Sequence, residues 1–142
     1  MDLLLYCFAR GVIGFIQSLP LLWVARLGRI GGAITYRLDG RHRRVALRNL
    51  QMCFGNEKSE AELRAIAEEN FRRIGENFAC AAKTASMHFE DLRQYVEFVA
   101  PRDIMAPSEP RSIVAAIGHF GNFELYARFG QFAPSFRSAT RV

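Results

Sequence analysis

The sequence contains few of the residues on which disulfide-stabilised or metal-binding folds depend. Its three cysteines, at positions 7, 53 and 80, lie far apart and form no C-x-x-C pair. An odd number of distant thiols does not make a disulfide framework, and no histidine stands at zinc-ligand spacing from them. We therefore expect three reduced thiols in a cytosolic compartment and no metal site.

A long uninterrupted apolar run is also lacking. Residues 3–36 are strongly apolar, but the longest stretch without a charged residue, Gly11–Ala25, has 15 residues, whereas a straight transmembrane helix needs about 20. No basic residue precedes the apolar segment, so a secretory signal is not expected. Pro20 should kink or divide the helix. Three interpretations stay open: a helix in the membrane interface, which we favour, a short tilted span, or a buried core helix.

Acidic residues are scarce at the start of the chain. The first 50 residues hold eight arginines against Asp2 and Asp39, while the rest is nearly neutral. This asymmetry indicates an anionic partner. Because the apolar segment is adjacent and no nucleic-acid motif is present, we expect lipid headgroups and no nucleic acid, with a solvated basic face as the alternative. The residues expected at the membrane are Trp23, Arg26, Arg29, Arg41, Arg43, Arg44 and Arg48.

Two helices are predicted in the middle of the chain. An Asp39–Gly40 turn precedes an amphipathic basic stretch, and Ser59 with Glu62 has the spacing of a capping box before a second, long helix. Apolar residues recur along that second helix at helical spacing, which predicts a core-facing stripe. The stripe consists of Leu63, Ile66, Phe71, Ile74 and Phe78.

A strand, a turn and a helix are predicted near the end of the chain. The short β-branched segment 113–117 is typical of a buried parallel strand, which predicts the α/β fold class. Gly121 permits a tight turn, and Asn122 is a good N-cap for the helix that follows. His119 and Glu124 lie on either side of this turn, at the sheet edge where α/β proteins bind ligands.

His119 and Glu124 can converge across such a turn. The glutamate would accept a hydrogen bond from one imidazole nitrogen and raise the basicity of the other, which makes a general base whose nucleophile comes from the substrate. The alternative is that His119 only caps or packs. No third ligand for a metal stands nearby.

Four segments together resemble a known family. "GHFGNFE", preceded by "RRVALRNL", "MCFGNEKSEAEL" and "NFRRIGENFA", is similar to the bacterial lipid A biosynthesis acyltransferases of the lysophospholipid and glycerol-phosphate acyltransferase superfamily, over nearly the whole chain. The resemblance implies a glycerol-phosphate acyltransferase-like α/β sheet with flanking helices. Residues 1–36 would be a membrane-associated helical segment, and residues 37–142 the N-terminal part of the acyltransferase domain.

The resemblance also implies an activity. Such enzymes act at the cytoplasmic face of the bacterial inner membrane and move a fatty acyl chain from an acyl carrier protein or coenzyme A thioester to a hydroxyl of a lipid A precursor or related glycolipid. His119 would be the general base and Glu124 its orienting partner, with Gly121, Asn122 and Arg141 at the substrate. No metal or cofactor is implied.

Members of this family are longer than this chain, so we expect an N-terminal piece that is inactive alone. The alternative function is a non-catalytic, membrane-peripheral protein that binds anionic lipid through its basic amphipathic helices.

Overall fold

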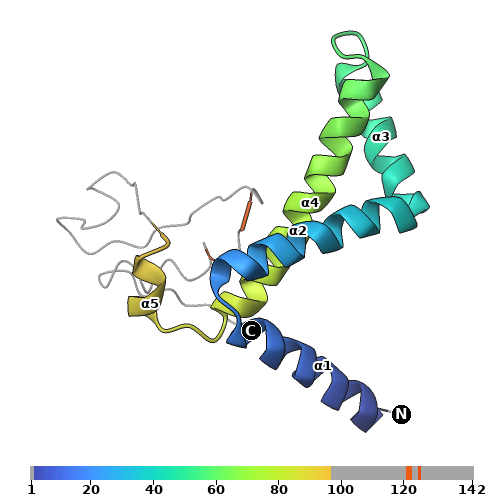
Figure 1. Cartoon of the computed structure of the whole chain (residues 1–142). Helices are drawn as coiled ribbons and strands as arrows, with labels where there is room; N and C mark the ends of the chain where they lie inside the picture. Colours follow the sequence, from blue (N-terminus) through green and yellow to red (C-terminus); the bar gives the residue numbers. More distant parts are fainter. Residues whose placement is uncertain (1, 97–120, 123–124, 126–142) are drawn as a thin grey trace, which may run out of the picture. The chain divides into compact units, whose positions relative to one another are not determined.

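The computed structural model describes residues 2–96, 121–122 and 125, and 82% of these residues are helical (Figure 1). The chain divides into two compact units, residues 1–83 and residues 84–142. The first unit contains four helices, the last of which ends one residue beyond it, and the described part of the second contains one short helix. The helices are α1 (Asp2–Ser18), α2 (Leu21–Leu38), α3 (Gly40–Phe54), α4 (Glu60–Thr84) and α5 (Phe89–Arg93).

Pro20 divides the apolar front segment into α1 and α2, as its missing N–H and fixed φ predict. It occupies the N-cap position of α2, where its carbonyl accepts hydrogen bonds from the N–H groups of Trp23 (3.0 Å) and Val24 (3.2 Å). Within the described part of the chain, no helix combines the length and the hydropathy that crossing a bilayer requires. Membrane association of residues 1–36 stays a prediction.

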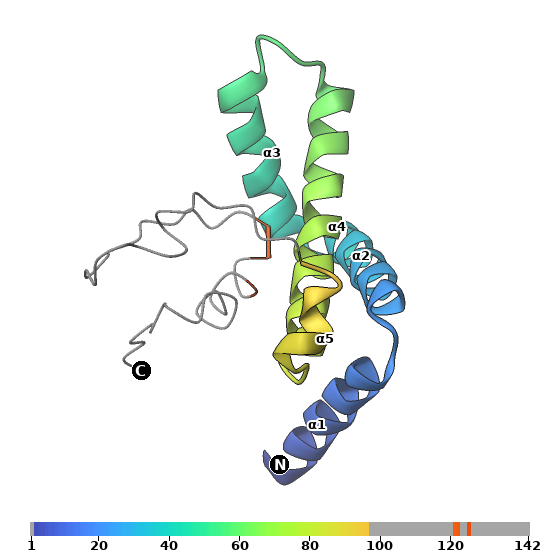
Figure 2. The same cartoon turned by 90° about the vertical axis from the view of Figure 1, so that its left-hand side faces the viewer.

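Side-chain caps begin α3 and α4, which form a hairpin (Figure 2). Asp39 accepts the N–H of His42 at 3.0 Å, and this bond lowers the pKa of the Asp39 carboxyl. The Ser59 N–H donates to Glu62 at 2.8 Å while the Glu62 N–H donates to the Ser59 hydroxyl at 3.4 Å. The predicted start of the basic helix and the predicted capping box are both confirmed.

Three glycines bring α2 and α4 into backbone contact. Gly28 and Gly32 are buried on α2, one helical turn apart, and they face Gly75 of α4. A Cβ on Gly28 would lie 2.6 Å from the Gly75 carbonyl oxygen, and one on Gly32 would overlap the Phe71 carbonyl. Small residues spaced four apart permit such close helix crossings. The sequence alone did not indicate this crossing.

A guanidinium clamp and an aromatic pair flank the crossing. Arg29 donates to Glu69 at 2.9 Å and to Glu76 at 3.1 Å, which ties α2 to α4. The hydrogen bond from Arg29 lowers the pKa of the Glu69 carboxyl, and the bond to Glu76 is the main cause that raises the pKa of Arg29. Farther along, the Tyr36 and Phe71 rings meet edge to face, with centroids 5.4 Å apart. The polar clamp therefore fixes which faces of the two helices meet.

The predicted α/β sheet is wrong for the chain that the structure describes. The described residues form helices and turns and contain no strand. The sheet was inferred from the short segment 113–117 and from the family resemblance, and that segment lies outside the described residues. In the described part, apolar residues recur every three or four positions, a period that forms helices and does not suit a pleated strand.

The predicted core stripe of α4 is only partly buried. Leu63 is buried, and Ala67, one turn later, is fully buried. In contrast Ile66 is 37% exposed, Ile74 45% and Phe78 73%. The periodicity located an apolar face correctly, but the neighbouring helices cover only a part of it. An apolar surface of this kind is available for contacts with another molecule or with lipid.

Candidate functional site

The turn at Gly121 and Asn122 has the predicted backbone geometry. Gly121 has a φ of +60°, a left-handed conformation that glycine adopts without the strain of a side chain. Asn122 follows, and the N–H of Leu125 donates both to its carbonyl at 3.1 Å and to its side-chain oxygen at 3.3 Å. Asn122 therefore accepts the N–H of the residue three positions later, as an N-cap residue does. Their contribution to substrate binding stays a prediction.

The candidate catalytic residues flank this turn but lie outside the described residues. His119, Glu124 and Arg141 all belong to this undescribed part of the sequence, so their convergence and their roles stay predictions. Among the residues that are described, no three His, Cys, Asp or Glu side chains gather in a way that would hold a metal ion.

The residues expected at the membrane fall into separate groups in the structure. Arg29 is engaged by two glutamates, as described above. Arg43 donates to the carbonyls of Tyr36 (2.7 Å) and Arg37 (2.9 Å) and so closes the C-terminal end of α2. Trp23 and Arg26 are both exposed, with the Arg26 guanidinium 5.4 Å from the indole centroid. The remaining three, Arg41, Arg44 and Arg48, are exposed on α3.

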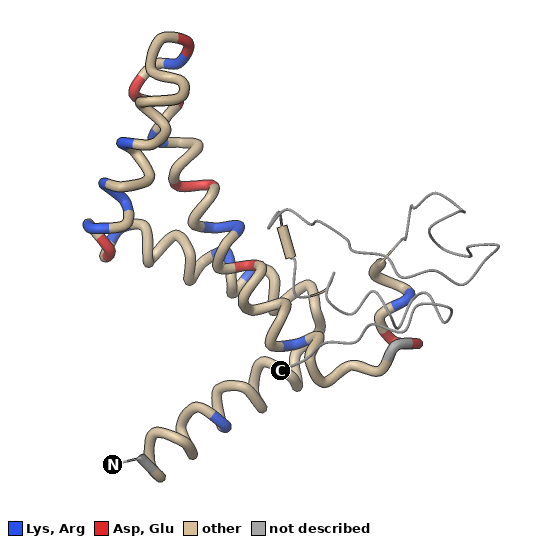
Figure 3. The backbone as a smooth tube through the Cα atoms, turned by 180° about the vertical axis from the view of Figure 1, so that it is seen from behind, with Lys and Arg blue, Asp and Glu red and all other residues tan. Residues whose placement is uncertain are grey.

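Large apolar side chains are exposed along α1. Leu4 is 79% exposed and Phe8 70%, and successive residues such as Leu3, Leu4 and Leu5 point to different sides of a helix. Figure 3 shows Lys and Arg gathered along α3 and α4, whereas α1 carries one basic residue. The described part of the chain therefore leaves most of the apolar surface of α1 uncovered.

Helix α2 carries a second exposed apolar surface, which the sequence analysis missed. Its centre lies about 120° around the helix from that of the buried face of Val24, Gly28 and Gly32, and its spacing of 4, 3, 4 and 4 residues could have revealed it. Arg26 and Arg37 lie beside it, because each is within about 100° of its centre around the helix. We call this surface the outer stripe of α2; its residues are Trp23, Leu27, Ile30, Ile34 and Leu38.

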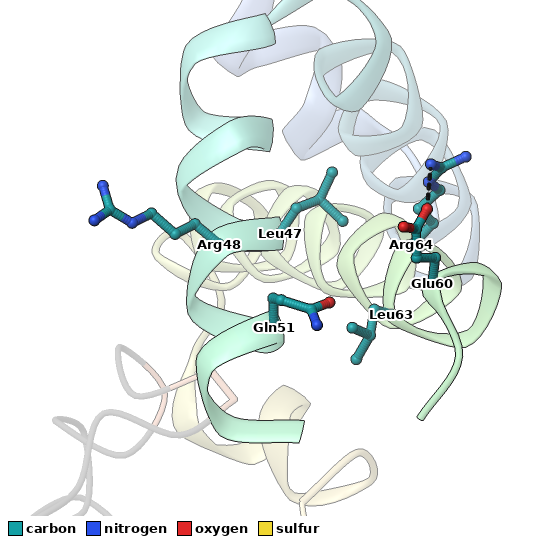
Figure 4. A pocket seen from close by; sticks show the side chains of 6 residues that line it. All are labelled: Leu47, Arg48, Gln51, Glu60, Leu63 and Arg64. Carbon is teal, nitrogen blue, oxygen red and sulfur yellow. Dashed lines mark hydrogen bonds and ion pairs between the residues drawn. The ribbon is translucent and has the colours of Figure 1, made fainter. Parts of the chain in front are cut away.

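A small pocket lies between α3 and α4 (Figure 4). It has a volume of about 280 Å³, and its polar lining includes Arg64, which pairs with Glu60 at 2.9 Å. None of its lining side chains is a histidine, a cysteine or an alcohol, and its one carboxylate, Glu60, is paired with Arg64, so it lacks the histidine base proposed for acyl transfer. It is not a candidate active site. Its lining residues are Leu47, Arg48, Gln51, Glu60, Leu63 and Arg64.

Comparison with known proteins decides the family. The sequence profile described as "Bacterial lipid A biosynthesis acyltransferase" matches residues 3–136, which is nearly the whole chain and includes the turn at Gly121. The chain belongs to this acyltransferase family. The family assignment confirms the resemblance carried by the four sequence segments.

A curated member of the family aligns with most of the chain. The lipid A biosynthesis lauroyltransferase of Escherichia coli (strain K12) is 30% identical over 128 residues, which are 87% of this chain and 41% of that enzyme. The chain thus spans less than half the length of the relative that it matches. No solved structure matched the chain.

Proposed function

We propose that the protein transfers a fatty acyl group from a thioester, on acyl carrier protein or coenzyme A, to a hydroxyl of a lipid A precursor or related glycolipid. The observation that carries this proposal is the family match over residues 3–136. The name of the E. coli relative, a lauroyltransferase of lipid A biosynthesis, supports a fatty acyl group and an acceptor in lipid A biosynthesis. Because the chain spans 41% of that relative, the activity is proposed for the native protein.

The reaction needs a base, which we propose is His119. Its free ring nitrogen takes the proton of the acceptor hydroxyl, and the oxygen attacks the thioester carbonyl. The tetrahedral intermediate collapses with cleavage of the C–S bond, and the departing thiolate receives the proton from His119. Glu124 accepts a hydrogen bond from the other ring nitrogen and stabilises the imidazolium.

The geometry of the turn supports this assignment. Gly121 has a φ of +60°, which suits a tight turn, and the carbonyl and side-chain oxygens of Asn122 accept the N–H of Leu125. A reversal between positions 119 and 124 permits side chains that would diverge by about 140° on one continuous helix to approach each other. Substitution of Gly121 by a residue with a Cβ would strain this reversal.

We further propose that α1 and the outer stripe of α2 lie in the cytoplasmic interface of the inner membrane. An apolar helical face flanked by arginines and a tryptophan suits the boundary between acyl chains and headgroups. Arg26 and Trp23 stack at that boundary, with 5.4 Å between guanidinium and ring. Arg29 is not part of this proposed membrane surface, because its guanidinium is ion-paired with Glu69 and Glu76.

Acyl transfer by the native protein tests the proposed function. Purified protein is mixed with dodecanoyl thioester and a hydroxyl-bearing lipid A precursor, and acylated lipid is measured by mass spectrometry. We expect ester formation with release of one thiol for each acyl group transferred. Lipid binding without ester formation, over a series of thioester chain lengths, would favour the non-catalytic alternative.

The proposed membrane position of α1 can be tested by comparing the labelling rates of Cys7 and Cys53 in the same molecule. Both are exposed, Cys7 on α1 and Cys53 on α3. On vesicles of phosphatidylethanolamine and phosphatidylglycerol, a charged thiol reagent should label Cys7 at least about tenfold more slowly than Cys53, because the interface excludes the reagent. Labelled peptides are quantified by mass spectrometry.

Two references make this experiment decisive. In guanidinium chloride the two thiols should react at similar rates. Cys80 should react slowly even without vesicles, because burial raises the pKa of its thiol. Equal labelling of Cys7 and Cys53 on vesicles that bind the protein would contradict the interfacial position of α1.

A further inference from the structure

Helix α3 carries an arginine stripe on one face. Arg41, Arg44 and Arg48 are spaced three and four residues apart, so they fall within about 60° of one another around the helix and extend over about 10 Å. All three side chains are exposed. Val45 and the 76% exposed Met52 lie beside them. We call these three residues the arginine stripe.

The stripe differs from the arginines of α4 in having no acidic partner. On α4, Arg64, Arg72 and Arg73 each bind a glutamate four residues earlier, at 2.9, 2.6 and 2.8 Å. The segment Gly40–Phe54 contains no Asp or Glu, and within the described part of the chain the arginine stripe makes no ion pair. Three uncompensated charges in a row attract an anionic surface.

The side of α3 that carries Arg48 faces away from α4. In Figure 4, Leu47 and Gln51 point toward Leu63 of α4, whereas Arg48 points away from it. Figure 2 shows α3 and α2 on different sides of α4. Arg48 therefore faces away from α4, and the arginine stripe to which it belongs lies on a different helix from the outer stripe of α2.

We propose that the arginine stripe binds an acidic helix on a soluble protein partner. This inference rests on the proposed function, under which the partner is the protein that carries the acyl thioester. Acidic side chains three and four residues apart on a helix would match the arginine spacing. Val45 and Met52 would add apolar contacts, and methionine adapts readily to a partner surface. The face carries two exposed apolar residues, whereas the outer stripe of α2 carries five, so it offers less apolar surface for insertion into lipid.

Two acyl donors and one triple variant test the inference. The native protein and Arg41→Gln/Arg44→Gln/Arg48→Gln are compared with dodecanoyl acyl carrier protein and with dodecanoyl coenzyme A. We expect the triple variant to raise KM for the carrier-protein donor roughly tenfold, from the loss of three exposed charge pairs. The kcat and the KM for the coenzyme A donor should stay within about twofold of their original values.

Direct binding separates a failure of this inference from a failure of the proposed function. Carrier protein labelled with a fluorophore is titrated with the native protein and, separately, with the triple variant. The triple variant should bind the carrier protein roughly tenfold more weakly, whether or not acyl transfer occurs. The triple Lys variant should retain most of the affinity, because it keeps the charge. Arg64→Gln, whose guanidinium already pairs with Glu60, is the matched control and should bind normally.

Other outcomes would overturn the inference. Unchanged affinity for the carrier protein would show that the stripe does not bind it. An equal rise in KM for both donors would point to a phosphate group that the donors share. Loss of binding to phosphatidylglycerol vesicles, with carrier-protein affinity unchanged, would assign the stripe to lipid headgroups.

Discussion

Replacing Gly32 by alanine should unfold the helical unit far more readily than the same change one residue earlier. A Cβ at Gly32 would overlap the Phe71 carbonyl and lie 2.8 Å from the Arg72 Cα, both of them backbone atoms that a rotamer change does not move. The two helices must separate. Overpacking of this kind costs about 1–3 kcal/mol, which exceeds the roughly 1 kcal/mol that alanine contributes to a helix relative to glycine.

Gly31 supplies the matched control for this substitution. A Cβ there would meet no atom within 4 Å, so Gly31→Ala should stabilise α2 by up to about 1 kcal/mol through helix propensity alone. The unfolding midpoint of both variants is measured in urea, in the same detergent, by circular dichroism at 222 nm. If Gly32→Ala and Gly31→Ala shifted the midpoint equally, the close crossing of α2 and α4 would be wrong.

Replacing His119 by alanine should lower the rate of acyl transfer by about 10²–10⁴-fold, the usual contribution of a general base. The loss should appear in kcat with little change in KM, because proton transfer occurs in the transition state. Glu124→Gln should cause a smaller loss, since the amide still reaches the imidazole but does not stabilise its charged form as a carboxylate does.

His88 provides the control for loss of a histidine. It precedes α5, where its side chain makes no capping hydrogen bond, and it has no role in the proposed reaction. His88→Ala should keep the original rate in the same thioester assay. Near-normal activity of His119→Ala would remove His119 from the mechanism, while the family assignment would stand.

Signals carried by neighbouring residues were read correctly from the sequence. Pro20 breaks the helix, Asp39 caps α3 and Ser59 pairs with Glu62, because each interaction involves residues within four positions of one another. The same holds for the turn predicted at Gly121 and the N-cap predicted at Asn122: Gly121 has a left-handed φ, and the Asn122 side chain accepts the N–H of Leu125.

Features that depend on distant residues were not read from the sequence. Gly32 and Gly75 are adjacent only because two separate helices cross, and no local pattern pairs them. Likewise, the exposure of Phe78 depends on where neighbouring helices end, although its spacing is that of a core residue. The sheet prediction was wrong for the described chain because it was extended from one five-residue apolar segment outside the described residues, whereas the described residues have apolar spacing of a helical period.

The close crossing of α2 and α4 at Gly28, Gly32 and Gly75 also sets an order of events during synthesis of the chain. Gly75 follows Gly32 by 43 residues, an interval that a ribosome covers in about 2–9 s at 5–20 residues per second. During this time α1 and α2 have left the ribosome without the helix that covers Gly28 and Gly32. Helices of this length relax in microseconds. The apolar surface of α1 and α2 is therefore formed, and able to meet its surroundings, well before α4 arrives to close the unit.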